Sequence, residues 1–417
     1  MANRQNVETF EFPRVSIGFF LQALEAEMRK DMERKRIPKP MLAIGLAGIG
    51  KTEGIKSIAN KLGIGMLEMR LVNYSETDLI GIPFLNEDQR TEHATNVLFP
   101  NEQRDGKYGI LLIDEFTSAA RNIQVPILQL TDSSRSVGQY KLPDGWKIVI
   151  AGNGPNDGGT FTNLPGTVIS RAGCFYVEPS VESWLDWAGK NRIHHAIRAF
   201  IRMNGDKYLH DYTEDEATGY DRAFASPRSW ANLSEVLYDF DEAHTGWTAR
   251  RETYEALTDH HKILVASRIG NSTADRFESF VAFETQLIDP MKILGANDDA
   301  SRAKLPKLSS MAPELQYLTI TSLSDNLARV ANGKPVAVVG TEVTIKPAYI
   351  QALANAINWI YSGVTNPTGE MATFATAELT SDITGFAHKV FSSEMFRNLC
   401  PLHEHALRNL GENIFRN

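Results

Sequence analysis

Cysteine is scarce in this sequence and occurs in no pattern that chemistry commonly uses. The two cysteines, Cys174 and Cys400, stand far apart among 417 residues, without the spacing of a metal site or a disulfide framework. A reducing compartment is the natural setting for such a chain. No apolar run reaches the length that crosses a bilayer, and the first residues lack the apolar centre of a signal peptide. We therefore expect a cytoplasmic protein with no membrane segment.

A concentrated block of basic residues is also missing. Lysine and arginine number 43 against 51 acidic residues, which gives a formal net charge of −8 at pH 7. Because nucleic acids are bound mainly by clustered Lys and Arg side chains, this balance disfavours nucleic acid as the main partner, although it leaves room for a local basic pore. The composition that is present, 42% hydrophobic and 23% charged, is typical of a globular protein. The length predicts two or three domains.

The most informative stretch runs from residue 42 to residue 52, Leu-Ala-Ile-Gly-Leu-Ala-Gly-Ile-Gly-Lys-Thr. An apolar run from Met41 predicts a buried strand, and residues 45–52 then fit G-x-x-x-x-G-K-[ST], the pattern of a phosphate-binding loop. The glycines permit a tight turn whose N–H groups face phosphate oxygens, and a helix follows. Lys51 is expected to reach the β- and γ-phosphates, and the Thr52 hydroxyl to ligate Mg²⁺. The predicted ATP-binding residues of the loop are Gly45, Ala47, Gly48, Ile49, Gly50, Lys51 and Thr52.

A second signal comes from residues 109–115, Gly-Ile-Leu-Leu-Ile-Asp-Glu. Four consecutive aliphatic residues predict a strand buried on both faces, as in a parallel sheet. Its carboxyl end, where α/β sheets bind their ligands, carries Asp114 and Glu115. We interpret this pair as a Walker B element. Asp114 is expected to hold Mg²⁺, and Glu115 to polarise the water that attacks the γ-phosphate.

Strands alternate with helices between residues 41 and 177, which predicts an α/β fold with a parallel sheet covered on both faces. A hairpin is expected at residues 137–145, and an apolar strand follows at 147–151. Asn153 comes directly after this strand. Its amide can orient the attacking water if the strand lies beside the Walker B strand, but an Asn in a Gly/Pro turn is also common without any such role.

From residue 181 onward the apolar residues recur with helical period. The predicted helices include one that begins near Pro227, where proline suits the first turn, and one over residues 381–396. The predicted domains are an N-terminal helical segment (1–37), an α/β nucleotide-binding domain (38–179), a helical lid (180–290) and a helical C-terminal region (291–417).

Taken together, these motifs resemble those of the AAA+ ATPases, and more narrowly of the MoxR-like and dynein-related group. The resemblance covers residues 38 to about 240, and its narrower part is carried by residues 77–81, 154–160 and 226–230. It implies an AAA+ P-loop αβα sandwich followed by an all-helical lid. It also implies roles for three further residues. Asn153 matches sensor 1, Arg171 an arginine finger that acts on ATP in the neighbouring subunit, and Arg228 sensor 2 on the lid.

The same resemblance implies a function. The ligands would be ATP and Mg²⁺, and the assembly a homo-oligomeric ring, expected to be a hexamer. The implied activity is chaperone-like remodelling of a protein client, often beside a partner with a von Willebrand factor A-type fold. Two alternatives stay open. One is a nucleic-acid-associated AAA+ motor or restriction-type translocase, which the net charge disfavours. The other is a scaffold without catalysis, which the intact set Lys51, Asp114, Glu115 and Arg171 disfavours.

Overall fold

The structure is a computed structural model, and it describes residues 12–94, 97–155, 157, 161–212, 223–243, 259–330, 335–339, 342–364, 366, 369–383 and 386–414. The chain divides into two compact units, the first ending at Ser183 and the second beginning at Trp184. The first unit contains a large parallel sheet, and the second contains most of the later helices. Among the helices that the structure describes, none is both long enough and apolar enough to cross a membrane.

Six parallel strands form the sheet of the first unit, in the order β1-β10-β2-β9-β6-β3. Strand β2, which precedes the phosphate-binding loop, lies between β9 and β10. Strand β6, which ends in the two carboxylates, lies between β9 and β3. The predicted α/β fold with a central parallel sheet is thus confirmed. The strands are β1 (Arg14–Ser16), β2 (Met41–Ile44), β3 (Gly65–Arg70), β6 (Gly109–Asp114), β9 (Trp146–Gly152) and β10 (Gly173–Glu178).

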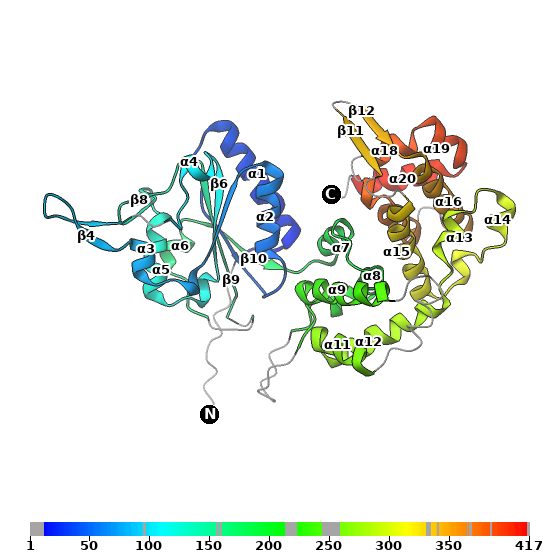
Figure 1. The fold of residues 1–417 in the computed structure, drawn as a ribbon, viewed down its shortest axis with the longest axis horizontal. Helices are drawn as coiled ribbons and strands as arrows, with labels where there is room; N and C mark the ends of the chain where they lie inside the picture. Colours follow the sequence, from blue (N-terminus) through cyan, green and yellow to red (C-terminus); the bar gives the residue numbers. More distant parts are fainter. Residues whose placement is uncertain are drawn as a thin grey trace. The chain divides into compact units, whose positions relative to one another are not determined.

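Helices cover both faces of this sheet (Figure 1). Successive side chains of a strand point to opposite faces. In β6, therefore, Ile110 and Leu112 pack with α1 and α2, whereas Leu111 and Ile113 pack with α5 on the other face. Burial on both sides explains why the sequence of β6 is continuously apolar. The helices are α1 (Ile17–Arg34), α2 (Lys51–Leu62), α3 (Glu76–Ile80), α4 (Glu102–Asp105), α5 (Arg121–Leu130) and α6 (Gly166–Ile169), with 3-10 turns η1 (Leu71–Asn73) and η2 (Phe116–Ser118).

Two antiparallel hairpins belong to the first unit. The hairpin expected at residues 137–145 is present as β7 (Ser136–Val137) and β8 (Tyr140–Lys141). A second hairpin, which the sequence did not predict, is formed by β4 (Pro83–Leu85) and β5 (Thr91–His93). In Figure 1 this second hairpin projects away from the sheet. It therefore adds nothing to the core of the unit.

Helix α16 lies at the centre of the second unit and has buried side chains along its whole length. Helices α13, α15, α17, α19 and α20 pack against it. The helices from α7 onward are α7 (Val181–Lys190), α8 (His195–Tyr208), α9 (Pro227–Ala243), α11 (Asp259–Ile269), α12 (Asn271–Val281), α13 (Pro290–Leu294), α14 (Asp299–Ala303), α15 (Pro313–Val330), α16 (Pro347–Gly363), α17 (Glu370–Leu379), α18 (Ala387–Phe391), α19 (Glu394–Leu399) and α20 (His403–Ile414). They are accompanied by 3-10 turns η3 (Ala282–Gln286), η4 (Leu308–Ser310) and η5 (Ser381–Ile383), and by a hairpin of β11 (Val336–Val339) and β12 (Glu342–Ile345).

The single helix predicted over residues 381–396 is wrong. The structure has η5 followed by two short helices, α18 and α19, with Ser393 at the start of the second one. The Ser393 hydroxyl accepts a hydrogen bond from the backbone N–H of Phe396, as serine commonly does at a helix start. The rings of Phe391 and Phe396 stack with centroids 4.8 Å apart. The break in the helix therefore brings two aromatic side chains together in the core.

A buried charge cluster joins helices from both of the predicted helical regions. Arg198 on α8 is almost fully buried, and its guanidinium pairs with Asp325 on α15 and with Glu378 on α17. His195 Nδ1 lies 3.6 Å from Asp325 Oδ2. Burial raises the pKa of Asp325, but Arg198 and His195 outweigh burial and hold that pKa at about 2. Because buried opposite charges are costly to separate, this cluster fastens α8 to α15 and α17.

The variant Asp325→Asn should lower the free energy of unfolding of the second unit by about 3–5 kcal/mol, the usual cost of removing one partner of a buried ion pair. The reason is that Arg198 would lose one of its two described carboxylate partners and keep its charge away from water beside Glu378. Urea unfolding followed by tryptophan fluorescence measures the change. The matched control is Asp299→Asn, because Asp299 is fully exposed, and a change within about 0.5 kcal/mol is expected for it. Equal losses in both variants would contradict the role of the cluster.

The pH dependence of stability checks the same interaction independently. The pKa of Asp325 is about 2 in the folded protein, against about 3.9 in an unfolded chain. Its contribution to stability is therefore complete above a pH of about 4, and is lost as the pH falls toward 2. The Asn variant should lack that part of the acid dependence.

Candidate functional site

The loop between β2 and α2 is shaped by glycines. Gly48 and Gly50 have φ angles of +76° and +91°, in the left-handed region that favours glycine. A Cβ atom on Gly45 would lie 2.0 Å from the carbonyl oxygen of Val177 in β10. The chain can therefore leave β2 along this path only if no side chain is present at Gly45. Successive N–H groups in such a turn form a concave site for an anion.

Lys51 is the first residue of α2 and is only 8% exposed. Its Nζ atom donates to the carbonyl oxygen of Gly45 at 2.6 Å and to that of Leu46 at 2.9 Å. The lysine side chain thus reaches back across the loop. Ile49 and Ile55 anchor the loop and the helix in the core. An ammonium group and a helix N-terminus in one loop both attract negative charge.

The end of β6 meets this loop. The Thr52 hydroxyl donates to Asp114 Oδ2 at 2.7 Å, and Asp114 Oδ1 accepts the backbone N–H of Glu115 at 2.9 Å. A hydroxyl and a carboxylate at this distance from each other are suitable ligands for Mg²⁺, which prefers oxygen and binds through few protein groups. The structure therefore brings the two predicted magnesium ligands together.

Glu115 has a φ angle of +55°, which is uncommon for a residue with a side chain. Its backbone turns the chain from β6 into η2, and Gln124 holds this turn in place. The buried Gln124 Nε2 donates to the carbonyl oxygens of Phe116 at 2.9 Å and Ala119 at 3.3 Å. A strained backbone that surrounding contacts fix is a frequent feature of functional sites. Gln124 thus fixes the backbone that follows Glu115.

Asn153 follows β9, the strand between β2 and β6. Its backbone N–H donates to the Thr117 hydroxyl at 3.0 Å, and the same hydroxyl donates to the Asn153 carbonyl oxygen at 2.9 Å. Thr117 belongs to η2, immediately after the two carboxylates. The position of Asn153 is therefore fixed against η2, the turn after Asp114 and Glu115, which is called the Walker B turn below. Sequence reasoning missed Thr117, because its role depends on a contact 36 residues away.

A buried carboxylate supports the segment after Asn153. Asp157 Oδ2 accepts the backbone N–H of Gly154, and Asp157 Oδ1 accepts the hydroxyl of Tyr176, both at 2.6 Å. Burial, with this bond to Asp157, raises the pKa of Tyr176. Of the segment 154–160 that carried part of the family resemblance, Asn156 and residues 158–160 lie outside the described residues.

A cation that the sequence analysis overlooked stands beside the carboxylates. Arg70 ends β3 and is the register partner of Asp114. Its ion pair with Glu68, at 2.9 Å, raises its pKa, and the charges of Asp114 and Glu115 raise it further. The sequence contained one signal for this residue. Arg70 is a basic residue at the end of a predicted strand, and that strand lies next to the Walker B strand.

The two predicted arginines, Arg171 and Arg228, are far from the phosphate-binding loop in the sequence. Arg171 follows α6, and its Nη1 atom pairs with Asp132 Oδ1 at 2.5 Å. Arg228 is the second residue of α9 in the second unit, where it is exposed. Ser226 and Ser229 bond each other's backbone N–H groups and so cap the start of α9. The roles of Arg171 and Arg228 stay predictions.

Neither a family model nor a curated protein matches this sequence. Among solved structures, RuvB of Thermotoga maritima, described as a Holliday junction branch migration motor, matches with a TM-score of 0.33 and 16% identity, over 79% of this chain and 91% of that one. A putative ATPase from Cytophaga hutchinsonii matches with a TM-score of 0.30 and 12% identity, over 90% and 81%. Hsp104, imaged with ATPγS and casein, matches with a TM-score of 0.34 and 16% identity, over 68% and 46%.

These neighbours are AAA+ ATPases. TM-scores of this size do not establish a common fold, so the fold assignment depends on the strand order and the loop of this chain.

The site combines a turn of N–H groups, a buried ammonium, a hydroxyl–carboxylate pair and a second carboxylate at one edge of the sheet. Among the residues that the structure describes, no group of three or more His, Cys, Asp or Glu side chains is placed to hold a metal ion. Thr52 and Asp114, whose side-chain oxygens lie 2.7 Å apart, are the pair that we expect to hold Mg²⁺. Such a set suits a phosphate chain with bound Mg²⁺, whose remaining ligands are water and phosphate oxygens.

Proposed function

We propose that this protein is an AAA+ ATPase of the MoxR-like type, which hydrolyses MgATP and uses the reaction to remodel a protein partner. The observation that carries the proposal is the contact of Thr52 Oγ1 with Asp114 Oδ2 at 2.7 Å. It joins the phosphate-binding loop to the acidic strand end, which are the two halves of an ATP site. Neither half alone would support hydrolysis.

Each group has a chemical role in this proposal. When ATP binds, Lys51 would leave the carbonyl oxygens of Gly45 and Leu46 and donate to phosphate oxygens. Its ammonium would then neutralise part of the negative charge of the phosphates. Mg²⁺, when bound at Thr52 and Asp114, supplies further neutralisation. Glu115 takes up the proton of the attacking water. Asn153 orients that water, which is consistent with its place at the end of β9, between the two halves of the site.

Arg171 lies near the end of the sheet at which β2 and β10 begin, whereas the phosphate-binding loop lies at the end at which β2 stops. It comes two residues before Gly173, which begins β10 and pairs with Met41 at the start of β2. The loop instead follows Ile44 at the end of β2. Since these four residues span about 10 Å, Arg171 is badly placed for its own ATP site. This supports a role in trans, and with it a homo-oligomeric ring, which we take to be a hexamer.

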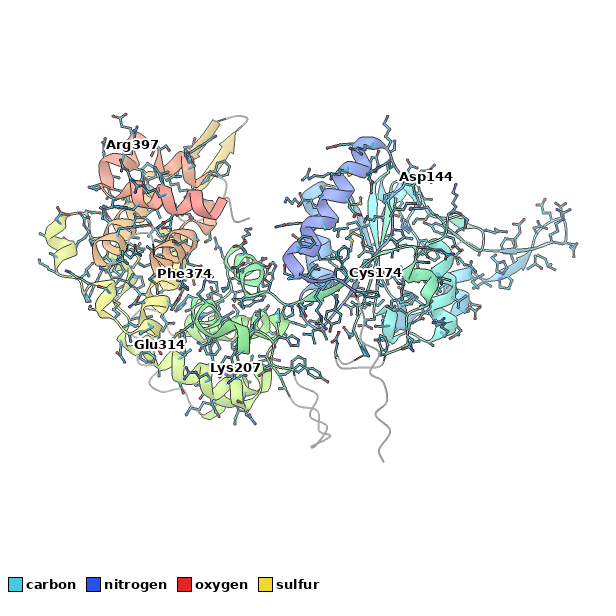
Figure 2. All side chains as sticks on the ribbon, turned by 180° about the vertical axis from the view of Figure 1, so that it is seen from behind. Asp144, Cys174, Lys207, Glu314, Phe374 and Arg397 are labelled. Atoms are coloured by element: carbon cyan, nitrogen blue, oxygen red, sulfur yellow. The ribbon has the colours of Figure 1, made fainter. Side chains whose placement is uncertain are left out.

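The β4–β5 hairpin supports a polypeptide as the client. Ile82, Phe84 and Leu85 are 70%, 47% and 62% exposed, and in Figure 2 side chains of the hairpin stand clear of the rest of the unit. Gathered apolar side chains on a surface commonly mark an interaction site. Residues 82–94 carry three carboxylates, Glu87, Asp88 and Glu92, against the single arginine Arg90. That charge would repel a phosphate backbone, so it disfavours the nucleic-acid alternative.

The variant Lys51→Ala should lose measurable ATP binding in isothermal calorimetry, because the ammonium is the strongest positive charge in the loop. Lys61→Ala is the matched control, since Lys61 lies on the same helix but is exposed and pairs with Glu25. It should bind ATP normally. Unchanged affinity in the Lys51 variant would remove the loop from the proposal.

The variant Glu115→Gln should bind ATP with unchanged affinity but hydrolyse it at least about tenfold more slowly, as expected when a general base is lost. A steady-state phosphate-release assay measures the rate. Glu102→Gln, which changes an exposed glutamate of α4, serves as the control. Normal turnover in the Glu115 variant would leave catalysis without its proposed base.

The double variant Ile82→Ser/Leu85→Ser should keep its basal ATPase rate and bind a permanently unfolded protein, such as reduced carboxymethylated α-lactalbumin, at least about fivefold more weakly, because apolar burial is lost. Fluorescence anisotropy measures the binding. Ile263→Ser changes an isoleucine that is 65% exposed on α11 and should have no effect. Salt-sensitive stimulation of the ATPase by DNA, unaffected by the hairpin variant, would instead favour the nucleic-acid motor.

A further inference from the structure

The candidate arginine finger is held by an acidic residue of its own chain. Arg171 Nη1 lies 2.5 Å from Asp132 Oδ1, and both side chains are 38% exposed. Asp132 comes two residues after the end of α5, and Arg171 two residues after the end of α6. An ion pair this exposed adds little to the stability of a fold. Its main physical effect is to restrict the orientation of a long, flexible side chain.

Helix α5 connects this pair to the catalytic carboxylates of the same subunit. At its start, Gln124 is fully buried and bonds to the turn that follows Glu115. Arg121 Nη1 donates to the carbonyl oxygen of Asn163 at 3.1 Å, so α5 is also fastened to the segment that leads into α6. One helix of ten residues thus runs from the Walker B turn to within two residues of Asp132.

We propose that Asp132 is a positioning residue for Arg171, which orients the guanidinium that acts on ATP in the neighbouring subunit. The inference rests on the proposed function, because it takes Arg171 to be the finger. Asp132 contacts Nη1, which is one of three nitrogens in a group with five N–H donors. The pair with Asp132 and contacts with phosphate oxygens are therefore compatible. Through α5, the orientation of the finger depends on the Walker B turn of the subunit that lends it.

The direction of the effect follows from this geometry. A transition-state contact loses much of its value when the group is displaced by a fraction of an ångström or gains rotational freedom. Removing the charge of Asp132 should therefore slow hydrolysis in the assembled protein and leave ATP binding intact. If Asp132 instead competed with phosphate for Arg171, its removal would raise the rate.

The experiment compares Asp132→Asn with Asp132→Glu and with the control Asp186→Asn, which removes an exposed carboxylate elsewhere. The Asn variant is expected to lower kcat about three- to tenfold with unchanged KM, in line with a displaced rather than a missing group. The Glu variant should restore part of the loss, because it returns the negative charge. The control should behave like the original chain. Thermal unfolding checks that each variant is folded.

A double-mutant cycle with Arg171→Ala separates positioning from an independent effect. If Asp132 acts through Arg171, the double variant should be no slower than Arg171→Ala alone. Additive losses, a raised rate in Asp132→Asn, or an unchanged rate in a folded Asp132→Asn would each overturn the proposal.

Loss of the finger role and loss of the positioning role give different results. A normal rate in Arg171→Ala would overturn the finger itself, and with it this part of the proposed function. A slow Arg171→Ala beside a normal Asp132→Asn would overturn only the positioning role. Mixing variant and original subunits adds a direct readout, because a finger acting in trans depresses the rate of its unmodified neighbours.

Discussion

The hydrogen bond between Thr52 and Asp114 joins two segments that lie 62 residues apart in the sequence. It depends on β2 and β6 ending at the same edge of a sheet in which β9 lies between them. That middle strand must leave space at its end. A Cβ atom on Gly152, the last residue of β9, would lie 2.5 Å from the Thr117 hydroxyl. A small residue at this point therefore allows the Walker B turn to pack closely against β9.

The elements that could be predicted from the sequence are those whose structure is determined by residues adjacent in the chain. The apolar run at Met41–Ile44, the glycine loop and the aliphatic run before Asp114 each specify their own local structure. Strand β1 was missed because only Val15 in it is hydrophobic. Its three residues form a strand because they pair with Tyr176, Val177 and Glu178 of β10, which lie more than 160 residues later in the sequence.

Contacts across long separations also explain what was missed around the site and in the second unit. Thr117, Asp157 and Asp132 are ordinary polar residues in the sequence, and only the folded chain puts them against Asn153, Tyr176 and Arg171. The charge cluster of Arg198, Asp325 and Glu378 is drawn from three helices. It places residues of the predicted lid and of the predicted C-terminal region in one compact unit. Periodicity can predict such helices but not which charged side chains meet between them.

The link between the two edges of the sheet follows from its topology. A helix that connects parallel strands must return from the carboxyl edge, where the first strand ends, to the amino edge, where the next begins. Helix α5 makes this return between β6 and β9, and its ten residues span about 15 Å. It therefore begins near the turn that follows Glu115 and ends two residues before Asp132, near the amino edge where Arg171 precedes β10. The same crossover that joins these parallel strands thus sets Asp132, which follows it in each subunit, against the arginine that we propose this subunit lends to its neighbour.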